Sequence, residues 1–258
     1  MIPTKAQFFI KPNAPDAGRI AYLQRAGKGP TVVWLGGFRS DMRATKAEAL
    51  DGWAEKNDRA FLRFDYSGHG ESDGNFEDGT ISRWRDDALA MIHAHAGPAP
   101  VLVGSSMGGW IALLAAKMLA GTAQAPSRLV LIAPAADFTE KLMYPSFSSQ
   151  QKKELEDRGL ITIPSAYGDP YPITRALIED GSRNNLLDGP IVTGCPVDIL
   201  QGMADPDVPW QHAMATVEHL PGDAVTMTLV KDGDHRLSRP QDIALLLATV
   251  EKAVASGH

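Results

Sequence analysis

One serine in a glycine-flanked turn carries the clearest chemical signal in this sequence. Residues 104–108 read Gly-Ser-Ser-Met-Gly and follow directly on the apolar run Val101–Val103. A serine nucleophile in a sharp strand-to-helix turn needs small residues two places before and after it, so that strand and helix can approach closely. Gly104 and Gly108 fill those places, which predicts Ser106, rather than the serine before it, as the nucleophile. The five-residue pattern alone would also fit a plain tight connection.

Candidate partners follow this serine in the order acid, then histidine. Asp205 stands three residues after Gly202, beyond the apolar run Val197–Leu200, and His235 follows the run Val225–Val230. Serine, acid, histidine is the chain order of hydrolases that use this kind of turn. In such a set the histidine takes the serine proton and the acid orients the imidazole. The pattern therefore predicts acyl transfer through Ser106, Asp205 and His235.

Each partner has a competitor in the sequence. Asp207 is the rival acid, and a solvated turn rich in Asp and Pro is the alternative interpretation for both carboxylates. The other histidines fall on expected helices, in a glycine-rich turn or at the end of the chain (His93, His95, His212, His219, His69 and His258). Only His235 combines a loop position with the required order.

Acyl transfer also needs donors for the developing oxyanion. The loop Leu35–Ser40, with its Gly-Gly pair, follows the third expected strand, where folds of this kind supply one such donor. We expect the backbone N–H groups of Phe38 and Met107 to form the pair. Arg39 in the same loop is a candidate for binding a substrate carboxylate, because a guanidinium pairs with carboxylates in a fork. A plain turn and a surface arginine are the respective alternatives.

Short apolar runs alternate with helical patterns along the chain. The expected strands are Gln7–Ile10, Ile20–Gln24, Thr31–Leu35, Ala60–Phe64, Val101–Val103, Leu129–Ile132, Val197–Leu200 and Val225–Val230. The expected helices are Lys46–Lys56, Ile81–His95, Met107–Leu119, Trp210–Leu220 and Pro240–Ala255. This alternation predicts an α/β fold with a mainly parallel sheet covered by helices on both faces. Ligands of such sheets bind at the carboxyl ends of the strands, where all the candidate residues lie.

Residues 135–190 interrupt this alternation. They are rich in proline and scattered aromatic residues, and a structureless loop of that length inside a compact domain is uncommon. We therefore expect one domain over residues 1–258 that contains a small cap or lid insertion over residues 135–190.

Composition narrows the class of protein. The 25 Lys and Arg against 31 Asp and Glu give a net charge of -6, which argues against a nucleic-acid partner. The apolar stretch Trp110–Ala120 is too short to span a bilayer, so no membrane insertion is expected. No cluster shows metal-ligand spacing and no dinucleotide fingerprint is present, so we expect no metal and no cofactor. The single cysteine, Cys195, and the absence of a secretory signal at the N-terminus predict a cytoplasmic protein.

Several segments resemble a known family. The family consists of single-domain α/β hydrolases related to the mitochondrial abhydrolase-domain palmitoyl-protein thioesterase, also described as a mycophenolic acid acyl-glucuronide esterase. The similar residues are 35–42, 45–47, 63–68, 70, 72–74, 84–85, 104–110, 202–203, 205, 208–210 and 234–236. The resemblance implies the α/β-hydrolase fold and the same triad, Ser106, Asp205 and His235. It departs at Phe38 and Arg39 and over most of the cap. No mitochondrial leader is visible, so the chain is expected to be a bacterial-type relative.

The expected function is hydrolysis of a small-molecule carboxylic ester or acyl thioester through an acyl-enzyme on Ser106. A serine peptidase or amidase on the same fold is one alternative. A non-catalytic hydrolase-fold protein that only binds a ligand is another, and the serine at the turn disfavours a haloalkane dehalogenase, which needs an aspartate there.

Overall fold

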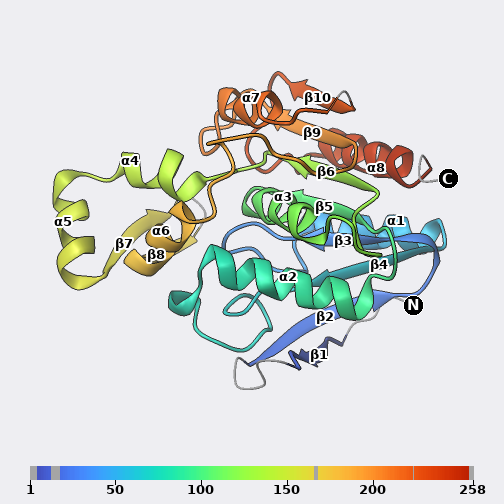
Figure 1. The fold of residues 1–258 in the computed structure, drawn as a ribbon, viewed down its shortest axis with the longest axis horizontal. Coiled ribbons are helices and arrows are strands. Elements are labelled where there is room, and N and C mark those ends of the chain that lie inside the picture. Colours follow the sequence, from blue (N-terminus) through green and yellow to red (C-terminus); the bar gives the residue numbers. More distant parts are fainter. Residues whose placement is uncertain (1–4, 13–17, 166–167, 223, 256–258) are drawn as a thin grey trace.

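The computed structural model describes residues 5–12, 18–165, 168–222 and 224–255, with only the backbone described at residues 165 and 168. Within them an eight-stranded sheet runs in the order β1-β2-β4-β3-β5-β6-β9-β10 (Figure 1). Its strands are β1 (Gln7–Ile10), β2 (Arg19–Arg25), β3 (Lys28–Leu35), β4 (Arg59–Phe64), β5 (Val101–Ser105), β6 (Arg128–Ile132), β9 (Val197–Gly202) and β10 (Val225–Val230). β2 pairs antiparallel with β1 and β4, and the pairs from β4 to β10 are parallel.

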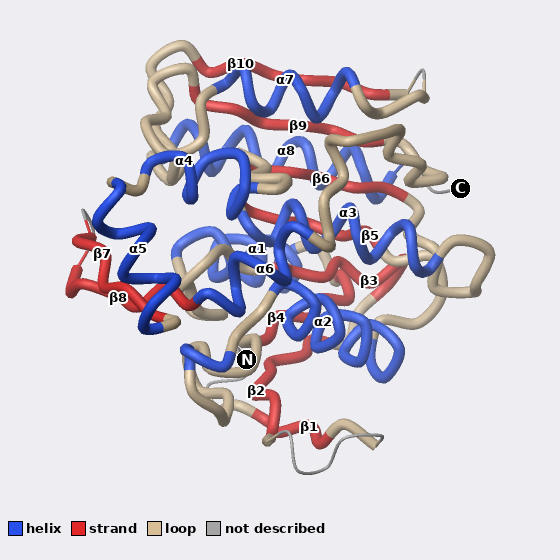
Figure 2. The backbone as a smooth tube through the Cα atoms, turned by 60° about the vertical axis from the view of Figure 1, so that its left-hand side comes forward, coloured by secondary structure: helices blue, strands red, loops and turns tan. Residues whose placement is uncertain are grey.

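Helices cover both faces of this sheet (Figure 2). One face carries α2 (Ile81–His95), α3 (Met107–Leu119) and α7 (Trp210–Glu218), and the other carries α1 (Thr45–Lys56) and α8 (Pro240–Ala255). Each face has its own apolar core. All five residues of β5 are buried, because a central strand is covered on both sides, and this explains its unbroken apolar run. The predicted α/β architecture, a mainly parallel sheet covered by helices on both faces, is confirmed.

Strand β3 is longer than the sequence suggests. It begins at Lys28, whereas the apolar run begins at Thr31. Lys28 and Gly29 are exposed, and the pairing of β3 with β4 is irregular between Lys28 and Val32. The exposed end of the strand contains no run of apolar residues, so the sequence predicted only the part from Thr31 to Leu35.

Between β6 and β9 the chain forms a group of small elements that projects from the sheet (Figure 1). They are a π-helical turn (Thr139–Met143), α4 (Tyr144–Ser146), α5 (Ser149–Arg158), β7 (Leu160–Ser165), β8 (Gly168–Thr174) and α6 (Arg175–Ser182). The predicted insertion, residues 135–190, covers this group, and its residues 166 and 167 lie outside the described residues.

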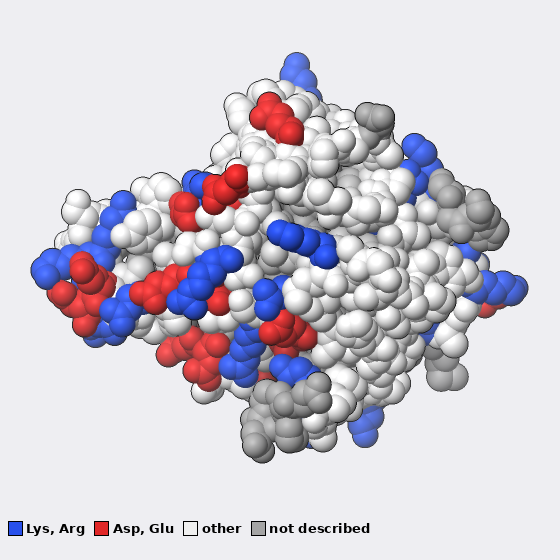
Figure 3. Space-filling model, viewed as in Figure 1, with Lys and Arg blue, Asp and Glu red and all other residues white. Residues whose placement is uncertain are grey.

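The antiparallel pair β7–β8 was not predicted. Pro164, Pro170 and Pro172 fall inside it, and proline normally argues against a strand. A sheet of only two strands tolerates proline because each strand has a free edge. Next to it, α5 carries the ion pairs Lys153–Asp157 and Glu154–Arg158 on its exposed side. Charged side chains of both signs accordingly gather on the projecting part of the surface (Figure 3).

Candidate active site

Ser106 stands in a strained turn between β5 and α3. Its backbone has φ 56° and ψ −118°, a conformation that costs a non-glycine residue about 1–3 kcal/mol. A Cβ at Gly104 would collide with the backbone of Gly108, and a Cβ at Gly108 would collide with the carbonyl of Leu35. Both glycines are therefore required by close backbone contacts. The Ser106 N–H donates to the Ile132 carbonyl at 2.8 Å, which ties the turn to β6.

The structure brings the three predicted side chains together. His235 Nε2 lies 3.1 Å from Ser106 Oγ, and His235 Nδ1 lies 2.8 Å from Asp205 Oδ2. The Asp205 carboxylate is fully buried and the imidazole is mostly buried. With a carboxylate as acceptor on one side, Nδ1 carries a hydrogen and the neutral ring presents the Nε2 lone pair to the serine hydroxyl. This is the arrangement that proton removal from Ser106 requires.

The loop around Asp205 distinguishes it from the rival acid. Asp205 Oδ1 accepts the N–H groups of Asp207 at 2.9 Å and Val208 at 2.8 Å, while Oδ2 also accepts Gln201 Nε2 at 3.2 Å. Asp207 is exposed and contributes its backbone to this set. The carboxylate that faces His235 is therefore that of Asp205.

Carboxylate and imidazole atoms of Asp205, Asp207 and His235 also lie within 4.8 Å of one another. Such a group could in principle bind a metal ion. Both ring nitrogens of His235 are engaged in the hydrogen bonds to Asp205 and Ser106, however, so an ion would have to break one of them. The hydrogen bonds of His235 to Asp205 and Ser106 therefore fit proton transfer better than metal binding.

The loop of residues 36–42, called the oxyanion loop after the role expected for it, lies against Ser106. A Cβ on Gly37 would be 3.5 Å from Ser106 Cβ, so the chain passes directly beside Ser106. Ser40 N–H donates to the Gly37 carbonyl at 3.1 Å and closes a turn around Phe38 and Arg39. Among the described residues, the backbone N–H groups of Phe38 and Met107 donate no hydrogen bond. Both are thus available to an incoming oxygen.

Arg39 extends from this loop toward the projecting insertion. Its guanidinium lies 4.6 Å from the centre of the Tyr171 ring, and Nη1 donates to the Asp169 carbonyl at 3.4 Å. The side chain is exposed at the rim of the cavity that contains Ser106. Arg39 therefore lines the cavity over Ser106 and contacts β8.

Two buried residues behind the oxyanion loop were missed by the sequence analysis. His69 Nε2 accepts the Arg39 N–H at 3.2 Å, and Asp65 Oδ1 accepts the Met42 N–H at 2.6 Å. Burial lowers the pKa of His69 to about 4 and raises that of Asp65 to about 6. Their position just after β4, at the same sheet edge as the site, is the signal that could have identified them.

Lys46 supports the site from the other side. Its Nζ donates to the Arg236 carbonyl, one residue after His235, and burial lowers its pKa to about 8. The loop that carries the imidazole is thereby tied to α1.

A cavity of about 610 Å³ opens over Ser106 and His235. The oxyanion loop contributes Phe38 and Arg39, and the loop after β9 contributes residues 206–208. Most of the remaining lining comes from the segment between β6 and β9: Ala135, Phe138, Leu142, Met143, Ser146, Phe147, Ile163, Pro164 and Tyr171. The wall formed by that segment is largely apolar and aromatic.

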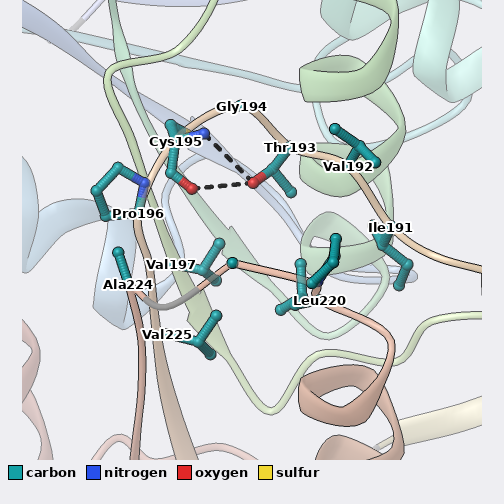
Figure 4. A pocket seen from close by; sticks show the side chains of 12 residues that line it. Ile191, Val192, Thr193, Gly194, Cys195, Pro196, Val197, Leu220, Ala224 and Val225 are labelled. Carbon is teal, nitrogen blue, oxygen red and sulfur yellow. Dashed lines mark hydrogen bonds between the residues drawn. The ribbon is translucent and has the colours of Figure 1, made fainter.

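A second cavity, of about 380 Å³, lies at the opposite end of β9 and β10 (Figure 4). Its described lining is mainly aliphatic, with Thr193 bonded to the backbone of Cys195. Burial raises the pKa of the Cys195 thiol to about 11, so the thiol is protonated at neutral pH. This cavity offers no nucleophile comparable to Ser106.

Comparison with known proteins decides the family. The model of the Alpha/beta hydrolase family matches residues 32–245. The chain belongs to this family. The hydrolase is 36% identical over 246 residues to the human protein named palmitoyl-protein thioesterase ABHD10, mitochondrial, covering 94% of this chain and 78% of that protein. The resemblance seen in the sequence is thus confirmed.

Solved structures extend the comparison. A putative hydrolase from Agrobacterium vitis S4 is 49% identical, covers 98% of this chain and 99% of its own, and superposes with a TM-score of 0.92. Mouse alpha/beta hydrolase domain-containing protein 10 is 34% identical with a TM-score of 0.88, covering 98% and 99% of the two chains. Est1E from Butyrivibrio proteoclasticus, in a structure with bound ferulic acid, is 19% identical with a TM-score of 0.77 over 96% and 97%, and shows the shared fold.

The expectation of a cytoplasmic location is wrong. The human, bovine and Sumatran orangutan (Pongo abelii) relatives are all named mitochondrial. A single cysteine indicates a reducing compartment but does not distinguish one such compartment from another, which is why the inference failed. Among the described helices of the hydrolase, none has the length and apolarity that crossing a bilayer requires.

Proposed function

We propose that the hydrolase cleaves carboxylic esters or acyl thioesters of small molecules through an acyl-enzyme on Ser106. The observation that carries the proposal is the position of His235, whose two ring nitrogens lie within hydrogen-bond distance of Ser106 Oγ and Asp205 Oδ2. The names of the thioesterase relatives support the substrate class.

In the first half-reaction, His235 takes the hydroxyl proton while Ser106 Oγ attacks the acyl carbonyl. The bond to the alcohol or thiol then breaks, and His235 returns the proton to that leaving group. Asp205 holds the Nδ1 hydrogen and stabilises the charged ring. Water repeats the sequence on the acyl-enzyme, which releases the acid and restores Ser106.

The N–H groups of Phe38 and Met107 would bind the oxygen that becomes negative during each attack. The N-terminus of α3 adds partial positive charge at the same place. Removing one donor of this kind typically costs about 3 kcal/mol of transition-state stabilisation.

The segment of residues 135–190 acts in this proposal as a cap that forms the acyl pocket. Its contribution to the cavity lining is mainly apolar, which suits a hydrocarbon or aromatic acyl group. Arg39 at the rim would bind a carboxylate carried by some substrates, and an unchanged KM for an acidic ester in Arg39→Ala would remove that role.

A panel of p-nitrophenyl esters and acyl-CoA thioesters of increasing acyl length tests the proposal, with a dipeptide amide as the probe for peptidase activity. We expect turnover of esters or thioesters, none of the amide, and loss of all turnover in Ser106→Ala. Amide cleavage at a comparable rate would favour the peptidase alternative. No turnover together with tight binding of an acyl compound would favour a non-catalytic binding protein.

A further inference from the structure

We propose that His69 is a positioning residue, which holds the oxyanion loop so that the Phe38 N–H faces the reacting carbonyl oxygen. The inference rests on the function proposed above, because this N–H matters to the reaction only if Ser106 attacks an acyl group. Its evidence is independent of the triad and comes from the contacts behind the loop.

The turn that carries Phe38 adopts a conformation that needs support. Arg39, its third residue, has φ 58°, in the left-handed region that a non-glycine residue enters at a cost of about 1–2 kcal/mol. The Arg39 N–H donates to His69 Nε2 at 3.2 Å. This bond fixes the peptide that joins Phe38 to Arg39.

The imidazole is held in the form that can accept this bond. His69 Nδ1 lies 3.3 Å from the Ser67 carbonyl, which can only accept, so Nδ1 carries the hydrogen and Nε2 presents its lone pair. The ring is 4% exposed, and burial lowers its pKa to about 4, so it is neutral at neutral pH. His69 can therefore act only as an acceptor toward Arg39 under working conditions.

Aromatic contacts fix the same ring on its other sides. Phe76 and Trp84 meet His69 edge to face, with centroids 5.2 and 5.1 Å away. The same two rings meet Phe38, at 5.0 and 5.8 Å. The two central residues of the turn thus reach the same cluster, Phe38 through its ring and Arg39 through its bond to His69.

The turn that carries Phe38 lies beside Ser106, so its position should affect the rate of the reaction. The turn begins at Gly37, which lies against Ser106, and an oxyanion donor is effective only within about 2.7–3.1 Å of the oxygen. A small displacement of the turn would take the Phe38 N–H out of range while the cavity and the triad stayed intact. The consequence should be seen in kcat rather than in KM.

Four variants test the inference: His69→Phe, His69→Gln, His69→Asn and, as a matched control, His95→Phe. His95 is also packed between rings, those of Phe9 and Tyr22, but lies at the end of α2. Activity on p-nitrophenyl butyrate is measured per site that reacts with a fluorophosphonate probe, so that misfolded protein does not count.

We expect kcat per reactive site to fall about 10–100-fold in His69→Phe, with KM within twofold of wild type. His69→Gln places an oxygen near the position of Nε2 and should recover to within about fivefold of wild type. His69→Asn reaches only the position of Nδ1 and should stay slow, and His95→Phe should match wild type.

A wild-type kcat in His69→Phe would overturn the inference, and so would equal kcat values in His69→Gln and His69→Asn. If His69→Phe does not fold, the comparison of the Gln and Asn variants alone decides. A parallel loss in His95→Phe would also overturn it. Failure of the wild-type protein to turn over or react with the probe would instead overturn the proposed function, and the inference with it.

Discussion

His235 lies 129 residues after Ser106 and 30 residues after Asp205 in the chain, yet its two ring nitrogens face both side chains. Each of the three stands just beyond the carboxyl end of a different strand, β5, β9 or β10. The contacts of single residues then fix how these side chains are oriented. Three N–H donors fix the Asp205 carboxylate, and that carboxylate fixes the tautomer of the imidazole.

Substitution of the two acids in the loop after β9, Asp205 and Asp207, should have very different effects on kcat. Asp205→Asn should lower kcat about 10⁴-fold, because an amide N–H facing Nδ1 would favour the wrong imidazole tautomer. Asp207→Asn, whose backbone N–H is retained, should lose no more than about tenfold. Steady-state kinetics on one ester, with circular dichroism to confirm folding, compares them. A larger loss in Asp207→Asn would reassign the acid.

His69 also makes a prediction about stability and pH. Its pKa is about 4 in the folded chain against an ordinary 6.5, so the unfolded chain binds a proton more readily between those values. Acidification from pH 6.5 to 4 therefore destabilises the fold through His69. Asp65, whose pKa is raised from 3.8 to about 6, acts in the opposite direction as pH falls from 6 to 3.8.

Replacing His69 by Gln isolates the contribution of His69 to this pH dependence. Between pH 7 and pH 4.5, we expect the free energy of unfolding of wild type to fall by about 2–3 kcal/mol relative to that of His69→Gln, because only wild type carries the histidine. Urea unfolding at the two pH values measures it. The same difference at both values would show that burial of His69 has no such effect.

At the scale of elements, the turn from β5 into α3 depends on backbone approach. Gly108→Ala would drive a Cβ into the carbonyls of Leu35 and Gly36, which cannot move without disturbing β3. We expect a loss of more than about 2 kcal/mol in the free energy of unfolding, together with loss of activity.

Gly52 in α1 is the matched control for that substitution. A Cβ on Gly52 would meet nothing within 4 Å, so Gly52→Ala should stabilise the helix by about 0.5–1 kcal/mol. Urea unfolding compares the two variants with wild type. A Gly108→Ala protein of normal stability and activity would contradict the account of the turn.

Elements also determine what could be predicted from the sequence. The core strands and helices were predictable because β5 and its neighbours are apolar runs and the helices keep their periodicity. The antiparallel pair β7–β8 was not, because its prolines argue against a strand, although a two-stranded sheet with free edges tolerates them. His69 was not predicted, because a side chain that accepts a hydrogen bond from a backbone N–H produces no sequence motif. Only its position in the fold identifies it.

At the scale of the whole molecule, Ser106, Asp205 and His235 follow strands of the large sheet, and the segment between β6 and β9 supplies most of the cavity wall. The acyl preference should therefore follow the insertion. Met143→Trp should reduce kcat/KM for long acyl chains about tenfold or more while short acyl esters are cleaved within about threefold of wild type, because the larger ring fills the pocket.

Met118→Trp, on the exposed side of α3, is the control and should leave the acyl-length profile unchanged. Kinetics over a series of p-nitrophenyl esters from acetate to palmitate measure both variants. An unchanged profile in Met143→Trp would show that the acyl group lies elsewhere.

The central claim is that Ser106 accepts the acyl group, and covalent labelling by a fluorophosphonate tests it most directly. Intact-mass and peptide analysis of the wild-type hydrolase should show one adduct, located on Ser106. Labelling should be absent in Ser106→Ala and at least about 10³-fold slower in His235→Gln, which lacks the base. An adduct on another residue, or an unreactive folded wild-type protein, would contradict the account.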